Sequence, residues 1–165
     1  MRAMQPYAVL FCCTGNICRS PTAEGVFNKK LSAAGLTGRV RADSAGTHGY
    51  HVGEPPDART QRAAKARGYD LSALRARRVE RDDFGRFDLV LAMDQENRAF
   101  LARLCPPSNG HKLRQMMEFA RNHAELEVPD PYYGGPDGFD RVLDILEDAT
   151  EGLLQSILSE QFPRR

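Results

Sequence analysis

The chain has 165 residues, 41% of them hydrophobic, which predicts one domain over residues 1–165 with a substantial core. Its 23 lysines and arginines and 22 aspartates and glutamates give a formal net charge of +1, so the composition indicates neither a nucleic-acid partner nor an anionic membrane. No apolar run approaches the ~20 residues of a membrane span, and residues 1–6 lack the apolar core of a signal peptide. We therefore expect a cytoplasmic protein without a membrane partner.

The first predicted elements are a strand and a helix joined by a short loop. An apolar run at 7–12 predicts the strand, and Ser20 followed by Pro21 predicts a helix start, with serine as N-cap. The loop at 13–19 reads CTGNICR, with a thiol at its start and a guanidinium at its end. Loop N–H groups at a helix N-terminus bind anions, and arginine holds two phosphoryl oxygens at once. The loop is therefore predicted to bind phosphate and to favour the thiolate form of Cys13.

Helix and strand signals then alternate through the first half of the chain. Apolar residues at three- and four-residue steps predict a helix over 21–34, which Gly35 ends, and 39–44 predicts a second strand. The glycines of 44–53 predict a loop at the rim of the site, and a helix is expected over 58–67.

The basic segment at 75–81 has two interpretations, a substrate-steering patch or a solvated surface. Glu80 interrupts it and two aspartates follow it. We therefore interpret it as a solvated surface.

The second half begins with the clearest strand signal, the apolar run at 87–93, and a helix is predicted over 94–106. Residues 112–119 predict a fourth, less regular strand, with an amphipathic helix as the alternative. Prolines restrict a loop at 128–136, and apolar residues keep helical phase from 139 to 157.

This alternation predicts an α/β fold, with a small parallel sheet of about four strands and helices on both faces. Ligands bind such sheets beyond the carboxyl ends of the strands. The phosphate-binding loop follows the first strand and falls at that edge.

The four cysteines raise the question of a metal site. Structural zinc sites pair Cys-x2–4-Cys with a second pair, whereas Cys105 stands alone here. Adjacent residues of a strand face opposite sides, so Cys12 packs into a layer while Cys13 begins the loop. We interpret Cys12 and Cys105 as buried apolar side chains and expect no metal and no cofactor.

Five motifs stand in one order along the chain: CTGNICRS at 13–20, DSAGT at 43–47, GEPPD at 53–57, FDLVLAMD at 87–94 and DPYYG at 130–134. Together they resemble the low-molecular-weight protein tyrosine phosphatases over nearly the whole chain. The resemblance implies hydrolysis of phosphotyrosine, in a protein or a small aryl phosphate, through a cysteinyl-phosphate intermediate and without metal.

The resemblance also implies roles for individual residues. Cys13 is expected to attack phosphorus while Arg19 and the loop N–H groups hold the oxygens, and Ser20 is expected to donate a hydrogen bond to the sulfur. Asp130 is the implied general acid for the leaving phenolate and then the general base for water.

Other side chains complete the predicted site. The remaining loop residues expected to bind substrate are Thr14, Gly15, Asn16, Ile17 and Cys18. Tyr50, Tyr132 and Tyr133 are expected to line the cleft, although Tyr50 also fits an exposed loop. Asn16, Ser44 and Asp94 are expected to hold the loop in its conformation. Family members often carry a histidine in the region of Leu74. This chain has none there, so we do not expect the loop to receive the support that such a histidine gives.

Three other functions compete with this interpretation. Arsenate reductases share the loop but need a downstream cysteine pair, which this chain lacks. In protein-arginine phosphatases the position of Ile17 resembles threonine, whose hydroxyl serves the guanidinium chemistry. A non-catalytic phosphotyrosine-binding module is expected to have lost Cys13, Arg19 or Asp130. The sequence does not specify the physiological substrate or an oligomeric state.

A redox role is predicted for Cys18. It lies five residues after Cys13 in one curled loop, so oxidation of Cys13 is expected to be trapped as a Cys13–Cys18 disulfide. The alternative for Cys18 is a buried apolar side chain.

Overall fold

A computed structural model describes residues 5–132 and 134–163. Its elements are β1 (Tyr7–Cys13), α1 (Arg19–Ala33), β2 (Val40–Gly46), α2 (Ala58–Ala66), α3 (Asp83–Arg86), β3 (Leu89–Ala92), α4 (Gln95–Leu104), the 3-10 helix η1 (Pro107–Lys112), β4 (Leu113–Gln115), the 3-10 helix η2 (Met116–Phe119) and α5 (Asp137–Gln161). No helix in this part of the chain is long and apolar enough to cross a membrane.

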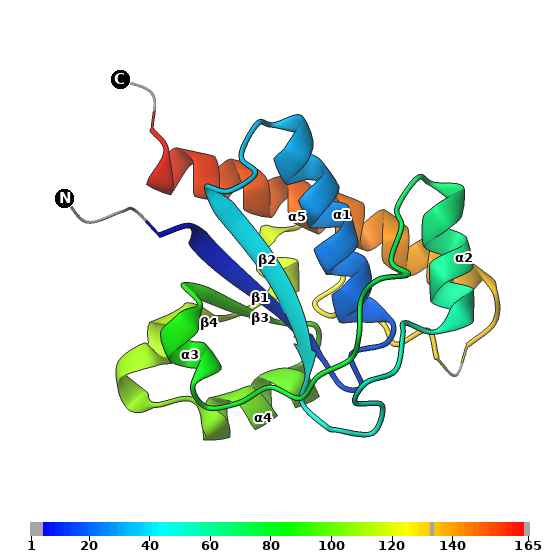
Figure 1. The fold of residues 1–165 in the computed structure, drawn as a ribbon, viewed down its shortest axis with the longest axis horizontal. Coiled ribbons are helices and arrows are strands. Elements are labelled where there is room, and N and C mark those ends of the chain that lie inside the picture. The colour runs from blue at the N-terminus through cyan, green and yellow to red at the C-terminus, as the bar shows by residue number, and fades with distance from the viewer. Residues whose placement is uncertain (1–4, 133, 164–165) are drawn as a thin grey trace.

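The strands form one parallel sheet in the order β2-β1-β3-β4 (Figure 1). The last residue of β1, Cys13, pairs with Gly46 at the end of β2, and Cys12 pairs with Ala92 at the end of β3. The predicted four-stranded α/β fold is confirmed. The carboxyl ends of β1, β2 and β3 therefore meet at one edge of the sheet.

Helices cover both faces of the sheet, with α1 and α5 on one side and α3 and α4 on the other (Figure 1). Alternate side chains of β1 pack into the two apolar clusters on opposite faces of the sheet. Val9, Phe11 and Cys13 belong to the cluster under α1 and α5, and Leu10 and Cys12 to the cluster under α3 and α4. This confirms that the two adjacent cysteines face different layers, because strand side chains alternate.

The start of α1 differs from the prediction. The helix begins at Arg19, and its N-cap residue is Cys18, which makes no side-chain capping bond. Ser20 lies inside the first turn, where its hydroxyl contacts Cys13 Sγ and accepts from Asn16 instead. The predicted serine cap is therefore wrong, because the loop uses this hydroxyl.

Two other helices begin close to their predicted positions, each at an aspartate. Asp57 caps α2 by accepting the N–H of Arg59, and Asp94 caps α4 by accepting the N–H of Asn97. Gly35 follows α1 at φ +71°, a left-handed conformation suited to glycine. These local signals lie within a few residues of the helix ends that they specify.

The predicted strand at 112–119 is confirmed only at its start, since β4 ends at Gln115. The Glu118 carboxylate accepts the N–H of Gln115, and the chain turns into η2. A capping interaction therefore overrides the apolar run that continues past β4.

The long helix α5 packs closely against the end of η2. A Cβ added at Gly152 would lie 1.8 Å from the carbonyl oxygen of Phe119. Backbone cannot move away cheaply, so we expect Gly152→Ala to lower the free energy of unfolding by about 1–3 kcal/mol. Urea denaturation of wild type and variant measures the difference. Gly85→Ala is the matched control because its added methyl has nothing within 4 Å, and equal losses from the two variants would contradict this packing.

Candidate active site

The loop between β1 and α1 is closed against the end of β2. The N–H groups of Thr47 and His48 donate to the carbonyl oxygens of Cys13 and Thr14 at 2.8 and 3.0 Å. A Cβ at Gly46 would lie 2.8 Å from the Thr14 oxygen, so only glycine allows this close approach. The loop is held by backbone bonds along its outer side.

A cavity of about 130 Å³ lies over this loop, at the carboxyl edge of the sheet. The residues that line it are Cys13, Thr14, Gly15, Ile17, Cys18, Arg19, Tyr50, His51, Asp130 and Tyr132. Most of the predicted site therefore meets here. Tyr133 lies outside the described residues, and Asn16, Ser20, Ser44 and Asp94 lie outside the cavity lining.

Cys13 lies at the bottom of the cavity, 3% exposed, with its Sγ 3.0 Å from the Ser20 hydroxyl. The Asn16 amide donates to Ser20 Oγ at 2.8 Å and to Ser44 Oγ at 3.0 Å. Asn16 adopts φ +58°, a conformation that asparagine tolerates better than most residues. Because Ser20 accepts from Asn16, its own proton is available to the sulfur.

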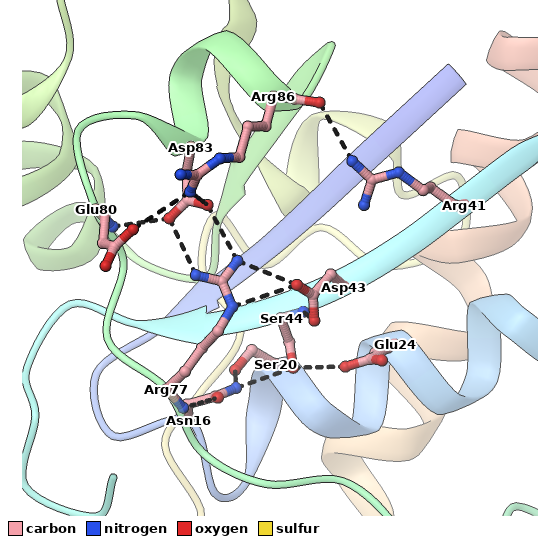
Figure 2. A network of polar contacts seen from close by, with 10 residues as sticks. All are labelled: Asn16, Ser20, Glu24, Arg41, Asp43, Ser44, Arg77, Glu80, Asp83 and Arg86. Atoms are coloured by element: carbon pink, nitrogen blue, oxygen red, sulfur yellow. Dashed lines mark hydrogen bonds and ion pairs between the residues drawn. The ribbon is translucent and has the colours of Figure 1, made fainter. Parts of the chain in front are cut away.

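The amide of Asn16 is held from the other side by Arg77, whose N–H donates to Asn16 Oδ1 at 3.0 Å. Figure 2 shows the Arg77 guanidinium between two carboxylates, with Nη2 3.1 Å from Asp43 and Nη1 3.1 Å from Asp83. The N–H of Gly46 also donates to the Arg77 carbonyl. The interpretation of the basic segment as a solvated surface is thus wrong for Arg77, because two carboxylates and the end of β2 hold it.

Leu74 lies in the region where a loop-supporting histidine is missing from this chain. It packs against the apolar cluster of Val26, Leu71 and Leu143. The Asn16 amide has partners for its oxygen and both hydrogens without it. The loop support in this chain therefore includes a backbone N–H, that of Arg77.

Arg19 is nearly inaccessible, with 3% of its side chain exposed. Its Nη1 lies 2.6 Å from Asp94 Oδ2 and donates to the Val128 carbonyl at 3.1 Å, and its Nη2 lies 3.7 Å from Asp130 Oδ2. Burial disfavours the charge of this guanidinium, but Cys13 and the two carboxylates outweigh burial and raise the pKa of Arg19. A permanent cation is thus fixed beside the thiol.

Asp130 enters the cavity from the loop before α5. Its side chain is 41% exposed, and its Oδ1 accepts the N–H of Tyr132 at 3.0 Å. The loop is tied to the sheet because the N–H of Val128 donates to the carbonyl of Met93 at 2.8 Å. A carboxyl group is therefore placed across the cavity from Cys13 with access to solvent.

The rim of the cavity is aromatic. Tyr50 is 70% exposed and stacks on His48 with ring centroids 5.0 Å apart. Tyr132 lies on the loop that carries Asp130, with its ring centroid 6.4 Å from that of His51. The rings of Tyr50, His51 and Tyr132 line the entrance to the cavity.

Two residues of the site had no predicted role. Asn97 is buried on α4 and donates to the Thr14 hydroxyl at 3.1 Å. His51 lines the cavity, and a Cβ at Gly15 would lie 3.0 Å from its ring. Their signals in the sequence were weak: Asn97 reads as an ordinary first-turn residue of α4, and His51 as a residue of a glycine-rich loop.

The site combines a thiol, a buried guanidinium and a carboxyl group around a cavity the size of a small anion. No group of three or more histidine, cysteine, aspartate or glutamate side chains in residues 5–132 and 134–163 is placed to hold a metal ion. The arrangement can bind a tetrahedral oxyanion, attack it with sulfur and supply a proton to a leaving group.

Comparisons with known proteins agree with this geometry. The family model "Low molecular weight phosphotyrosine protein phosphatase" matches residues 8–162. The chain is 46% identical over 154 residues to a low molecular weight protein-tyrosine-phosphatase of Streptomyces coelicolor, covering 92% of this chain and 93% of that protein. It is 39% identical over 136 residues to the human low molecular weight phosphotyrosine protein phosphatase, covering 82% and 85%. The crystal structure of a protein tyrosine phosphatase from Entamoeba histolytica, with Hepes in its active site, superposes with a TM-score of 0.91 at 43% identity, covering 94% and 99%.

The cavity brings two thiols together, which leads to a test of oxidation. Burial raises the pKa of Cys18 to about 12, so peroxide is expected to oxidise Cys13 first, to a sulfenic acid. The Cys18 thiol then condenses with it, forming a disulfide and releasing water. Mass spectrometry of non-reduced digests should find this disulfide in wild type. Without Cys18, a second peroxide oxidises the sulfenic acid of Cys13 to a sulfinic acid, which dithiothreitol does not reduce. After dithiothreitol, wild type should therefore recover the Cys13 thiol and Cys18→Ala should not. Equal recovery would contradict the role of Cys18.

Proposed function

The chain belongs to the family of low molecular weight phosphotyrosine protein phosphatases, and on this premise we propose that it hydrolyses phosphotyrosine through a phosphate ester of Cys13. The observation that carries the proposal is the meeting of Cys13, Arg19 and Asp130 in one cavity of about 130 Å³. The family accounts for the reaction, and the geometry supports the role of each group.

Substrate binding uses charge that is already in place. Arg19 is fixed by Asp94 and the Val128 carbonyl, so it meets the phosphate without rearranging. Its Nη2 faces Asp130 at 3.7 Å, and phosphoryl oxygens are stronger partners for the same nitrogen. The loop N–H groups from Thr14 to Arg19 hold the remaining oxygens at the N-terminus of α1.

The first chemical step transfers the phosphoryl group to sulfur. The Cys13 thiolate attacks phosphorus in line with the tyrosine oxygen, the P–O bond to tyrosine breaks, and Asp130 gives its proton to the departing phenolate. Arg19 and the loop N–H groups stabilise the charge on the equatorial oxygens.

The second step restores the thiolate. Asp130, now a carboxylate, takes a proton from water, the water oxygen bonds to phosphorus, and the S–P bond breaks with both electrons going to sulfur. The hydrogen bond from Ser20, 3.0 Å from Sγ, stabilises the thiolate as it leaves. Inorganic phosphate is released.

The depth of the cavity favours aryl phosphates. Cys13, a residue only 3% exposed, lies at the bottom, below a rim formed by Tyr50, His51 and Tyr132. A phosphotyrosine ring spans this depth and packs against the rim, whereas the short side chain of phosphoserine places the peptide backbone at the rim. Ile17 presents an aliphatic side chain to the cavity, so it offers no hydroxyl for phosphoarginine chemistry.

The covalent step is tested by Cys13→Ser. We expect this variant to lose phosphatase activity but to fold and still bind inorganic phosphate, because Arg19 and the loop hold the anion independently of sulfur. Calorimetry measures phosphate binding, and turnover of a phosphotyrosine peptide measures activity. Cys105→Ser is the control, since Cys105 lies outside the cavity lining. Residual turnover by Cys13→Ser, with wild-type contamination excluded, would overturn the mechanism.

The general acid is tested by Asp130→Ala with two substrates. Tyrosine titrates near ~10 and is a poor leaving group without a proton, whereas nitrophenolate leaves more easily. We expect the variant to slow phosphoenzyme formation far more for phosphotyrosine, by ~10²–10⁴-fold, and to lose the alkaline limb of the pH profile of kcat/KM.

Pre-steady-state bursts separate this step from hydrolysis of the phosphoenzyme. Asp137→Ala, which removes an exposed carboxylate at the start of α5, is the matched control. If Asp130→Ala slows both substrates equally, or keeps the alkaline limb, Asp130 only shapes the loop.

A further inference from the structure

Glu24 is a buried carboxyl group with no role in the mechanism above. It lies on α1, 8% exposed, and is not part of the cavity lining. In Figure 2 it lies at the end of a line of polar side chains that passes through Ser44 and Asn16 to Ser20. A carboxyl group at this depth is costly to bury, so its contacts are informative.

The line consists of short, buried hydrogen bonds. Ser44 Oγ donates to Glu24 Oε1 at 2.6 Å, and Asn16 Nδ2 donates to Ser44 Oγ at 3.0 Å. The same Nδ2 donates to Ser20 Oγ at 2.8 Å, and Ser20 Oγ lies 3.0 Å from Cys13 Sγ. Four contacts therefore connect the carboxylate to the sulfur.

The direction of every bond is set by the amide at the centre. The N–H of Arg77 occupies Asn16 Oδ1, so Nδ2, with two hydrogens, must face the two serines. Each serine accepts one of these hydrogens and is left with its own proton to donate outward. Ser44 donates to Glu24, and Ser20 donates to Cys13. The line is fully satisfied when both of its ends are anions.

We propose that Glu24 is a positioning residue, whose carboxylate, acting through Ser44 and Asn16, orients the hydroxyl of Ser20 toward the thiolate of Cys13. Protonation of Glu24 leaves Ser44 a neutral carboxyl oxygen in place of a carboxylate, which weakens the bond from Ser44 and loosens the line at its far end. The inference rests on the proposed nucleophilic role of Cys13 for its significance in catalysis.

Glu24 is placed to change protonation near neutral pH. Burial raises the pKa of Glu24 to about 7, against the bond from Ser44, which lowers it. Two charged groups act on it, Asp43 of β2, which raises the pKa, and Arg77, which lowers it. As pH falls through about 7, Glu24 takes up a proton and the line loses its anionic end.

The sign of the coupling separates this relay from a simple field effect. A negative charge on Glu24 acting through space would oppose a thiolate on Cys13, whereas the relay favours it. In wild type, we expect the Cys13 thiol–thiolate equilibrium to shift toward the thiol by about two- to tenfold when Glu24 is protonated. The ultraviolet absorbance of the thiolate between pH 4.5 and 9, relative to Cys13→Ser, measures it.

Two variants isolate the relay. Glu24→Gln keeps the volume but offers Ser44 only a neutral oxygen, as protonated Glu24 does. Above pH 8 we therefore expect a thiolate fraction below that of wild type, by the same two- to tenfold shift of the equilibrium, and no further shift near pH 7. Ser44→Ala breaks the line, and in that background Glu24→Gln should have no further effect. A thiolate fraction that rises when Glu24 is protonated, or a shift that survives Ser44→Ala, would overturn the proposal.

A second measurement needs only wild type and Ser44→Ala, in case Glu24→Gln does not fold. Coupling is reciprocal, so alkylation of Cys13 should raise the midpoint of the Glu24 carboxyl titration, followed by its ¹³C resonance. It should not do so in Ser44→Ala; an unchanged or lowered midpoint in wild type refutes the relay. Neither measurement uses turnover, so an inactive enzyme that shows the coupling would count against the proposed function alone.

Discussion

The buried charge of Arg19 is the constraint on which the site depends. A guanidinium with 3% of its side chain exposed must be paired, because an unpaired buried charge is strongly destabilising. Besides Thr14 of its own loop, its partners include Asp94 at the start of α4, the Val128 carbonyl after η2, and Asp130 on the loop before α5. One side chain thus draws the carboxyl edge of the sheet and the acid-bearing loop together around the cavity. A phosphate that enters finds a cation whose orientation is already settled.

The loop is fixed on its other side by neutral groups. The Asn16 amide has each of its hydrogen-bonding positions occupied, by Ser20, Ser44 and the N–H of Arg77. Arg77 is held in turn by Asp43 and Asp83 (Figure 2). Fully satisfied buried networks are rigid, and partly satisfied ones are costly. The loop is therefore preorganised before substrate arrives, which suits a reaction whose catalysis depends on positioning and charge stabilisation.

Acidic side chains support this site in different ways according to their surroundings. Asp94 is ion-paired and caps a helix, Asp130 is half-exposed and lines the cavity, and Glu24 is buried with a pKa raised to about 7. Asp94 forms an ion pair with the permanently charged Arg19. Asp130 has the access to solvent that proton exchange requires. Glu24 changes its ionisation near neutral pH. It is connected to Ser20 and Cys13 only through the side chains of Ser44 and Asn16.

Much of the fold could be predicted from the sequence alone, because the signals that specify it are local in the chain. The apolar strand before Cys13, the aspartates that cap α2 and α4, and the alternation of strand and helix are local patterns, so they predicted a four-stranded parallel sheet and a loop at its carboxyl edge. Only the tertiary structure decided what Arg77, Asn97 and Glu24 do. Their partners lie across the sheet or on other elements, and a hydrogen bond between residues far apart in the chain leaves no local periodicity. Ser20 carried a valid capping signal, but the folded loop uses its hydroxyl instead, with the sulfur that the resemblance implied and the Asn16 amide both within 3.0 Å.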